Sequence, residues 1–130
     1  MKISIVIPVY NEAENLPLLH SSLKQNLAES GLPWEVIYVD DGSRDNSLAI
    51  LEELAVADQE HVCVVSFRRN FGQTAAIAAG IDHTQGDVIV LMDADLQNDP
   101  VDIPMMIGKI NEGYDVVSGW RVNRQDKLIT

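Results

Sequence analysis

The feature that most limits the fold of this chain is the regular alternation of two kinds of segment. Short apolar runs rich in valine and isoleucine alternate with longer segments in which leucine, isoleucine or alanine recurs at a helical period. Such runs are typical of parallel strands buried on both faces and connected by helices. The pattern therefore predicts an α/β fold, with a mostly parallel sheet and helices on both of its faces. The predicted strands are residues 3–9, 35–40, 62–66, 87–92 and 115–118.

Four helices are predicted between these strands, and capping residues and stop signals set their limits. One of them, residues 73–83, consists mostly of small residues, so we expect it to lie deep against the sheet. The predicted helices are residues 12–29, capped by Asn11; a helix that follows the cap Asp45 and buries Leu48, Leu51, Leu54 and Ala55; residues 73–83; and a helix from about Asp102 to Gly113.

Length and charge narrow the possible functions. A chain of 130 residues is expected to form one domain, residues 1–130. Nine basic against twenty acidic residues give a net charge of −11, which argues against binding nucleic acid or an anionic membrane surface by charge. The single cysteine, Cys63, lies in an apolar block and is predicted to be a buried structural thiol. The first residues resemble neither a signal peptide nor a membrane-spanning helix, and a cytosolic setting fits.

The predicted topology brings polar segments together at one edge of the sheet. Right-handed crossovers place the carboxyl end of every parallel strand at the same edge, and open α/β sheets bind their ligands there. Polar or charged side chains follow every predicted strand, so we expect a binding site at this edge. The segments are residues 8–12, 40–43, 68–72, 93–95 and 119–121.

Asp93 and Asp95 follow a predicted strand and are two residues apart. In extended backbone such residues project to the same side, so both carboxylates can face one point beyond the sheet. A small set of carboxylate ligands favours Mg²⁺ or Mn²⁺, which keep open positions for phosphate oxygens. The alternative is a solvated turn in which Asp93 caps the next segment. The pair by itself leaves both interpretations open.

The other segments at this edge also allow two interpretations each. Either Asp40 or Asp41 accepts hydrogen bonds from a base or a ribose, or both acids serve a turn and a helix cap. Tyr10 offers an aromatic face to a base or sugar, whereas Glu12 can simply complement a helix dipole.

Three of the nine basic residues also lie at this edge. We predict that at least one of Arg68, Arg69 and Arg121 contacts a phosphate, the alternative being ion pairs with the acids nearby. No chemistry is assigned to His20, His61 or His83.

Five motifs in order make the chain similar to a known family. They are SIVIPVYNE, VDDGSRDNS, RRNFGQTAAIAAGI, MDADLQNDP and YDVVSGWR. Together they resemble glycosyltransferase family 2, and most closely its polyprenyl-phosphate branch of dolichyl-phosphate mannosyltransferase-like and bactoprenyl glucosyltransferase-like enzymes. The resemblance covers essentially the whole chain. It implies a GT-A (Rossmann-like) fold, a UDP- or GDP-linked sugar donor, Mg²⁺ or Mn²⁺, a lipid-linked phosphate acceptor and inversion at the anomeric carbon.

The resemblance also implies a role for individual residues. Those assigned to the base and ribose pocket are Pro8, Tyr10, Glu12, Val39 and Asp41, with Ala94 beside the nucleotide. Those assigned to the metal on the diphosphate are Asp93 and Asp95, with Gln97 close by, and Arg121 approaches the phosphates. Asp93, Asp95 and Arg121 would be the catalytic residues, because metal and arginine together stabilise the leaving nucleotide.

Members of this family are longer than 130 residues, and their further residues supply the acceptor site. We therefore expect the chain to be the N-terminal donor-binding part of such an enzyme, truncated at its C-terminus. We expect the full-length enzyme to lie at the cytoplasmic face of a membrane. This part of it is expected to be soluble and could associate with a second copy of itself. The alternative is a module that binds the donor without turnover. Phosphoacceptor receiver, sugar nucleotidyltransferase and dinucleotide-binding domains lack support, because the acidic or glycine-rich motifs that they need are missing after the first strand.

Overall fold

The structure, a computed structural model, describes residues 1–95 and 116–118. The helix predicted from about Asp102 to Gly113 lies outside the described residues. The other predicted elements are all present, with limits that differ by a few residues. They are β1 (Ile3–Val9), α1 (Leu16–Ser30), β2 (Trp34–Asp40), α2 (Ser47–Ala57), β3 (Val62–Ser66), α3 (Gln73–Asp82), β4 (Val88–Leu91) and β5 (Val116–Ser118).

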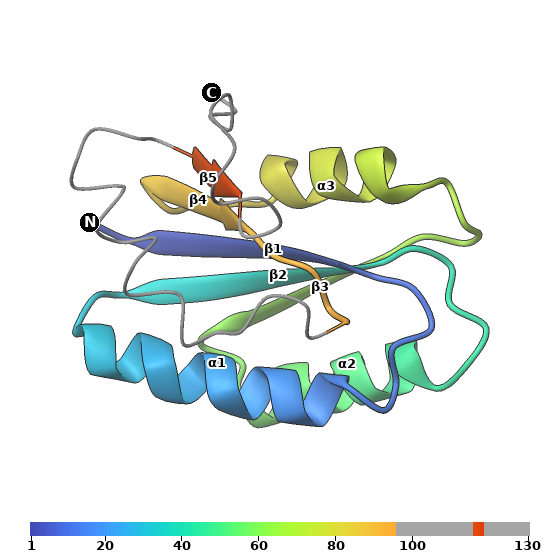
Figure 1. The fold of residues 1–130 in the computed structure, drawn as a ribbon, viewed down its shortest axis with the longest axis horizontal. Helices are drawn as coiled ribbons and strands as arrows, with labels where there is room; N and C mark the ends of the chain where they lie inside the picture. Colours follow the sequence, from blue (N-terminus) through green and yellow to red (C-terminus); the bar gives the residue numbers. More distant parts are fainter. Residues whose placement is uncertain (96–115, 119–130) are drawn as a thin grey trace.

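The described strands form one parallel sheet in the order β3-β2-β1-β4-β5. Helices α1 and α2 cover one face of the sheet and α3 covers the other (Figure 1). This arrangement confirms the predicted α/β fold with helices on both faces. The strand order changes direction at β1, which has β2 on one side and β4 on the other. Ligands of open parallel sheets bind beside such a switch point.

Burial of β1 on both faces explains its central position. Ile5 and Ile7 pack with Leu19 and Leu23 of α1 in the larger core cluster, and each of these side chains is fully buried. Val6 points to the opposite face, towards α3. Full burial of one such side chain contributes about 1.5–3 kcal/mol, so the two layers fix the position of β1 firmly.

Helix α3 lies very close to the sheet, as predicted from its small residues. Ala76 and Gly80 are buried, and a Cβ atom at Gly80 would overlap the Val6 side chain. The prediction that the helix lies deep is nevertheless wrong for the rest of its surface. Most other positions of α3 are partly or fully exposed, because its outer side is not covered by any of the described residues.

Helix α1 begins at Leu16, four residues after its predicted start. Pro17 lies in the first turn, where the missing N–H of proline costs little, and a turn closed by Glu12 and Asn15 precedes it. The prediction of Asn11 as the cap is therefore wrong, because the N-cap position is Asn15.

Helix α2 has its N-cap at Asn46, one residue after the predicted cap Asp45. Asp45 still holds the helix start, since its Oδ1 accepts hydrogen bonds from the N–H and the hydroxyl of Ser47 at 2.9 and 2.6 Å. Of the four side chains predicted to be buried, only Leu51 is fully buried. Leu48, Leu54 and Ala55 are partly buried, because α2 packs mainly on β3, the edge strand of the sheet.

Two of the histidines belong to a buried polar network away from the strand ends. His20 Nδ1 lies 2.7 Å from the Tyr38 hydroxyl, and its Nε2 lies 3.5 Å from Asp58 Oδ2. Asp58 also bonds His61, whose ring stacks on Trp34 at a centroid distance of 4.0 Å. The network joins α1, β2 and the end of α2, so it stabilises the fold.

Cys63 is half-buried beside the Ile37 and Val39 side chains, and burial raises the pKa of its thiol. Among the described residues, no helix has the length and apolar character needed to cross a membrane.

Candidate functional site

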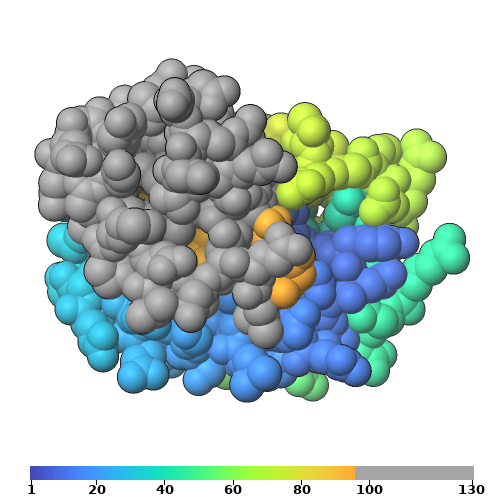
Figure 2. Space-filling view, in the orientation of Figure 1, coloured from blue at the N-terminus to red at the C-terminus, as the bar shows by residue number. Residues whose placement is uncertain are grey.

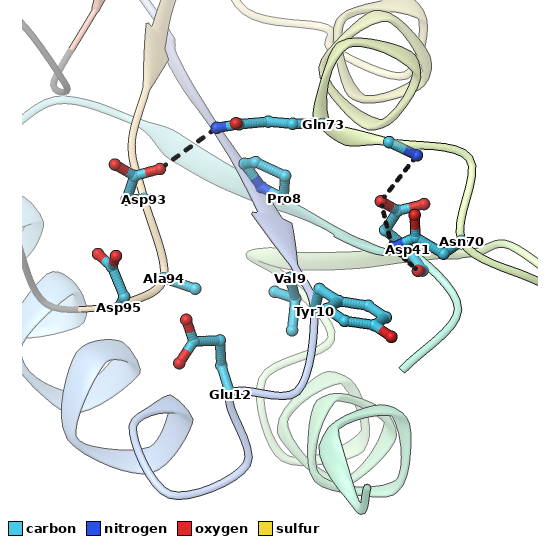
Figure 3. A pocket seen from close by; sticks show the side chains of 11 residues that line it. Pro8, Val9, Tyr10, Glu12, Asp41, Asn70, Gln73, Asp93, Ala94 and Asp95 are labelled. Atoms are coloured by element: carbon cyan, nitrogen blue, oxygen red, sulfur yellow. Dashed lines mark hydrogen bonds between the residues drawn. The ribbon is translucent and has the colours of Figure 1, made fainter. Parts of the chain in front are cut away.

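A cavity of about 300 Å³ opens at the carboxyl ends of β1 and β4, beside the switch point of the sheet. It brings together most of the residues that the sequence singled out for a binding site (Figure 3). In the space-filling view, orange atoms of the segment that ends at Asp95 reach the surface beside blue atoms of the N-terminal part (Figure 2). The cavity is lined by Pro8, Val9, Tyr10, Glu12, Asp41, Asn70, Gly72, Gln73, Asp93, Ala94 and Asp95.

Three residues assigned from the resemblance are not among those that line the cavity. The Val39 side chain is fully buried beneath α3, so any contact with a ligand would have to come from its backbone. Gln97 and Arg121 lie outside the described residues, and their roles stay predictions.

The cavity has two chemically different ends (Figure 3). The acidic end is formed by Glu12, Asp93 and Asp95. The Tyr10 end is formed by Tyr10, Asp41 and Asn70. This separation places a carboxylate-rich surface and an aromatic surface within one cavity, as a ligand with an anionic and a ring-shaped part requires.

Electrostatic repulsion is concentrated at the acidic end. Burial, followed by the negative charges of Asp95 and Glu12, raises the pKa of Asp93 from 3.8 to about 6. Burial also raises the pKa of Glu12, against a hydrogen bond from Asn15 that lowers it. Like charges held this close favour a bound cation or a proton. Within the described residues, however, no group of three or more His, Cys, Asp or Glu side chains has the arrangement of a metal site.

The raised pKa of Asp93 predicts a pH dependence of stability. Between about pH 4 and pH 6 the folded chain keeps a proton that the unfolded chain has lost, so the free energy of unfolding falls as the pH rises. Asp93→Asn removes the contribution of this carboxyl group to the pH dependence of the free energy of unfolding. In metal-free buffer, the melting temperature of the variant relative to wild type should therefore rise by about 4 °C between about pH 4 and pH 6.5. A constant difference across this range would show that Asp93 titrates normally.

Asp41 is 4% exposed and its carboxylate holds the loop before α3. Oδ1 accepts the backbone N–H of Phe71 at 2.8 Å, and Oδ2 accepts that of Gly72 at 3.1 Å. The Asn70 amide donates to Oδ2 and to the backbone carbonyl of Asp41, both at 3.2 Å. The structure thus gives Asp41 a positioning role that neither the turn interpretation nor the ligand interpretation included.

Asn11 fixes the loop on the other side of Tyr10. Its φ of 54° is unusual for a residue other than glycine. Its Oδ1 accepts the backbone N–H groups of Arg44 and Asp45 at 2.8 and 3.3 Å, and its own N–H donates to Ser43 Oγ at 2.9 Å. The backbone strain is therefore offset by contacts that hold Tyr10 in place.

The two arginines that follow β3 are exposed. Arg69 lies over the Phe71 ring at 4.5 Å, and the Phe71 ring meets Phe67 edge-on. Neither Arg68 nor Arg69 forms an ion pair with an acid in the part of the chain that the structure describes. A phosphate contact for either of them stays a prediction.

The cavity also includes residues that sequence reasoning did not assign to a ligand: Val9, Asn70, Gly72 and Gln73. Gln73 Nε2 lies 3.5 Å from Asp93 Oδ1, so the start of α3 reaches the acidic end. Only their position in the sequence could have indicated that these residues line a cavity, because all four lie at or just after the predicted end of a strand or at the start of a helix.

The sequence model of the family Glycosyl transferase family 2 matches residues 4–129. The chain therefore belongs to glycosyltransferase family 2, and its sheet has the GT-A arrangement. Both findings confirm predictions made from the motifs.

Two similar curated proteins carry the same name, undecaprenyl-phosphate 4-deoxy-4-formamido-L-arabinose transferase. The protein from Klebsiella pneumoniae subsp. pneumoniae is 48% identical over 127 residues, which are 98% of this chain and 39% of that protein. The protein from Pectobacterium atrosepticum is 48% identical over 126 residues, 97% of this chain and 38% of that protein. The chain thus spans about two-fifths of the length of these relatives.

Solved structures with the same fold include two sugar-nucleotide complexes. The mannosyltransferase PcManGT from Pyrobaculum calidifontis, in complex with GDP-Man and Mn²⁺, has a TM-score of 0.59 and 28% identity, and the match covers 72% of this chain and 27% of that one. S. aureus TarS 1–349 in complex with UDP-GlcNAc has a TM-score of 0.65 and 24% identity, covering 86% and 32%. The second match supports the fold alone.

Proposed function

We propose that this chain forms the donor site of a glycosyltransferase that moves a sugar from a UDP- or GDP-linked donor to a polyprenyl phosphate. The observation that carries this proposal is the single cavity that joins the Tyr10 end to the acidic end. A nucleoside fits the first end and a metal-bound diphosphate the second. The similarity to undecaprenyl-phosphate transferases supports the acceptor class, and PcManGT with GDP-Man supports the donor class.

The acidic end fits a divalent metal that is shared with the donor. Two carboxylates that line one cavity match the way in which Mg²⁺ or Mn²⁺ is held by few protein oxygens together with substrate phosphates. Asp93 and Asp95 would hold the ion, with Gln97 as a further predicted contact. When bound, the metal would stabilise negative charge on the leaving diphosphate.

The remaining side chains would bind and orient the donor. The 42%-exposed Tyr10 ring would stack on the base, and the Glu12 carboxylate would accept a hydrogen bond from a ribose hydroxyl. Ala94 leaves room beside the nucleotide because its side chain is small. Arg121 is predicted to approach the phosphates.

Transfer with inversion would occur in a single displacement. An oxygen of the acceptor phosphate forms a bond to the anomeric carbon while the bond from that carbon to the diphosphate oxygen breaks. The nucleoside diphosphate leaves with the bonding electron pair. Because a phosphate oxygen is already an anion at neutral pH, the protein mainly has to position the two reactants.

Titration calorimetry with UDP and GDP, each with and without Mn²⁺, tests the donor site. We expect at least one nucleotide to bind, with Mn²⁺ tightening its affinity by about tenfold or more. A nucleotide affinity that does not change when Mn²⁺ is added would contradict the assignment of the acidic end as the metal site. Adding a UDP-sugar and undecaprenyl phosphate then tests catalysis: donor binding without any product favours the alternative of a module without turnover.

A further inference from the structure

A chain of three buried side chains connects α1, β2 and the end of α2 on the face of the sheet opposite α3 (Figure 1). His20 of α1 lies between Tyr38 of β2 and Asp58, the C-cap of α2. The Tyr38 hydroxyl lies 2.7 Å from His20 Nδ1, and Asp58 Oδ2 lies 3.5 Å from His20 Nε2. None of the three residues is more than 9% exposed. We call His20, Tyr38 and Asp58 the buried latch.

The surroundings of His20 determine which of its ring nitrogens carries the proton in the neutral form. The Tyr38 side chain is fully buried, and its hydroxyl has no hydrogen-bond partner other than His20 within residues 1–95 and 116–118. It therefore has to donate its proton to Nδ1, because a buried hydroxyl proton without an acceptor costs free energy. The proton of the neutral ring then lies on Nε2, where it faces the Asp58 carboxylate.

Asp58 keeps its negative charge in this buried position. Its Oδ1 lies 2.8 Å from His61 Nδ1, and its Oδ2 lies 3.7 Å from Lys24 Nζ. Burial by itself would raise the pKa of Asp58, but the His61 contact and the Lys24 charge hold this pKa below its ordinary value. The charge of Asp58 attracts a second proton to the His20 ring, so the response of the latch to acid depends on the opposite side of that ring.

A second proton on His20 has to enter at Nδ1, the atom that accepts the hydrogen bond from Tyr38. The proton and the hydroxyl compete for the same lone pair, and a protonated ring leaves the Tyr38 O–H without an acceptor among the described residues. Burial lowers the pKa of His20 against the attraction of Asp58, and the positive charges of Lys24 and His61 lower it further. Uptake of a proton is therefore unfavourable while the latch is closed.

We propose that the buried latch is an acid-sensitive device that opens when His20 takes up a second proton. Below about pH 6.5, histidine in an opened or unfolded chain binds a proton that the closed latch excludes. The free energy of opening is therefore largest above this pH and falls as the pH falls. The device is separate from the proposed donor site, since none of its three residues lines the cavity.

Long-range ¹H–¹⁵N NMR spectra of the histidine rings test the closed state in wild type. At pH 7.5 His20 should be neutral, with its proton on Nε2 and none on Nδ1. A proton on Nδ1 of the neutral ring would mean that Tyr38 accepts the hydrogen bond, and it would overturn the proposal. A ring that is doubly protonated at this pH would overturn it as well.

Melting temperatures between pH 7.5 and pH 5 test the response to acid. His20→Gln has an amide that can accept from Tyr38 or donate to Asp58 but cannot titrate. The melting temperature of wild type should fall relative to that of this variant by about 3 °C or more across the range. A constant difference would overturn the proposal. His83→Gln is the matched control and should keep the acid response of wild type, because His83 is exposed at the end of α3.

Hydrogen exchange in wild type locates the opening and covers the case in which His20→Gln does not fold. The protection factors of the α1 amides should fall by about tenfold or more between pH 7.5 and pH 5, and those of the β1 amides should fall less. An equal fall in both elements would assign the acid response to unfolding of the whole domain and would overturn the proposal of a local latch.

Discussion

Asp95→Asn is expected to abolish the Mn²⁺-dependent part of nucleotide binding, weakening the affinity for UDP in the presence of Mn²⁺ by on the order of 100-fold. Asn replaces one carboxylate oxygen by an amide nitrogen, which is not a metal ligand, and removes one of the two charges that face the diphosphate. The same change relieves repulsion on Asp93, because the Asp95 charge raises the pKa of that carboxyl. Without metal, the variant should therefore bind UDP no more weakly than wild type.

The experiment separates the two roles of Asp95, because binding should weaken only when Mn²⁺ is present. Calorimetric titrations with Mn²⁺ and with chelator give both affinities for each protein. Asp82→Asn is a suitable control, since Asp82 is an exposed aspartate at the far end of α3. Equal losses with and without Mn²⁺ in Asp95→Asn would mean that Asp95 contacts the nucleotide directly and holds no metal.

Gly42→Ala is expected to lower the free energy of unfolding by about 2–4 kcal/mol. Gly42 has a φ of +72°, and a Cβ atom there would overlap the backbone of Arg69 and Asn70. Because neither backbone can rotate away like a flexible side chain, the loop after β2 and the loop after β3 must separate. The Asp41 contacts with residues 70–72 should be lost, and nucleotide affinity should fall with them.

Gly31→Ala is a matched control for this prediction. Gly31 has the same φ of +72°, but no atom lies within 4 Å of a Cβ placed there. Gly31→Ala should lower the free energy of unfolding only by the cost of a left-handed backbone at alanine, about 1–2 kcal/mol, and should leave the cavity unchanged. Urea unfolding measures both variants, and the difference between them isolates the close approach of the loops. Equal losses would show that the loops at Gly42 can move apart freely.

Periodicity and strand-end chemistry predicted most of this fold and much of its cavity. The valine- and isoleucine-rich runs identified all five described strands, because parallel strands buried on both faces leave little choice of residue. The crossover rule placed Asp93 and Asp95 beside Tyr10 and Glu12, and all four line the cavity, although the strand ends at Leu91 and the backbone bends at Ala94 and Asp95.

The parts that sequence could not predict depend on contacts between loops. The start of α1 was predicted too early because Asn11 is a good capping residue, and nothing local shows that its side chain bonds Arg44 and Asp45 instead. Asp41 likewise looked like a ligand or turn residue. Its bonds to residues 70–72 join positions about thirty residues apart, which become visible only when β2 and β3 lie side by side.

The hydrogen bonds between the loops at residues 10–13, 41–47 and 68–72 have a consequence for the thermodynamics of ligand binding. Loops usually lose conformational entropy when a ligand orders them, and that loss weakens binding. Here the loops are already ordered by one another, so the loss is incurred during folding. A nucleotide that enters this cavity meets a surface of fixed shape. The entropy of binding should therefore come mainly from the release of water and from the loss of rotation about the nucleotide's own single bonds.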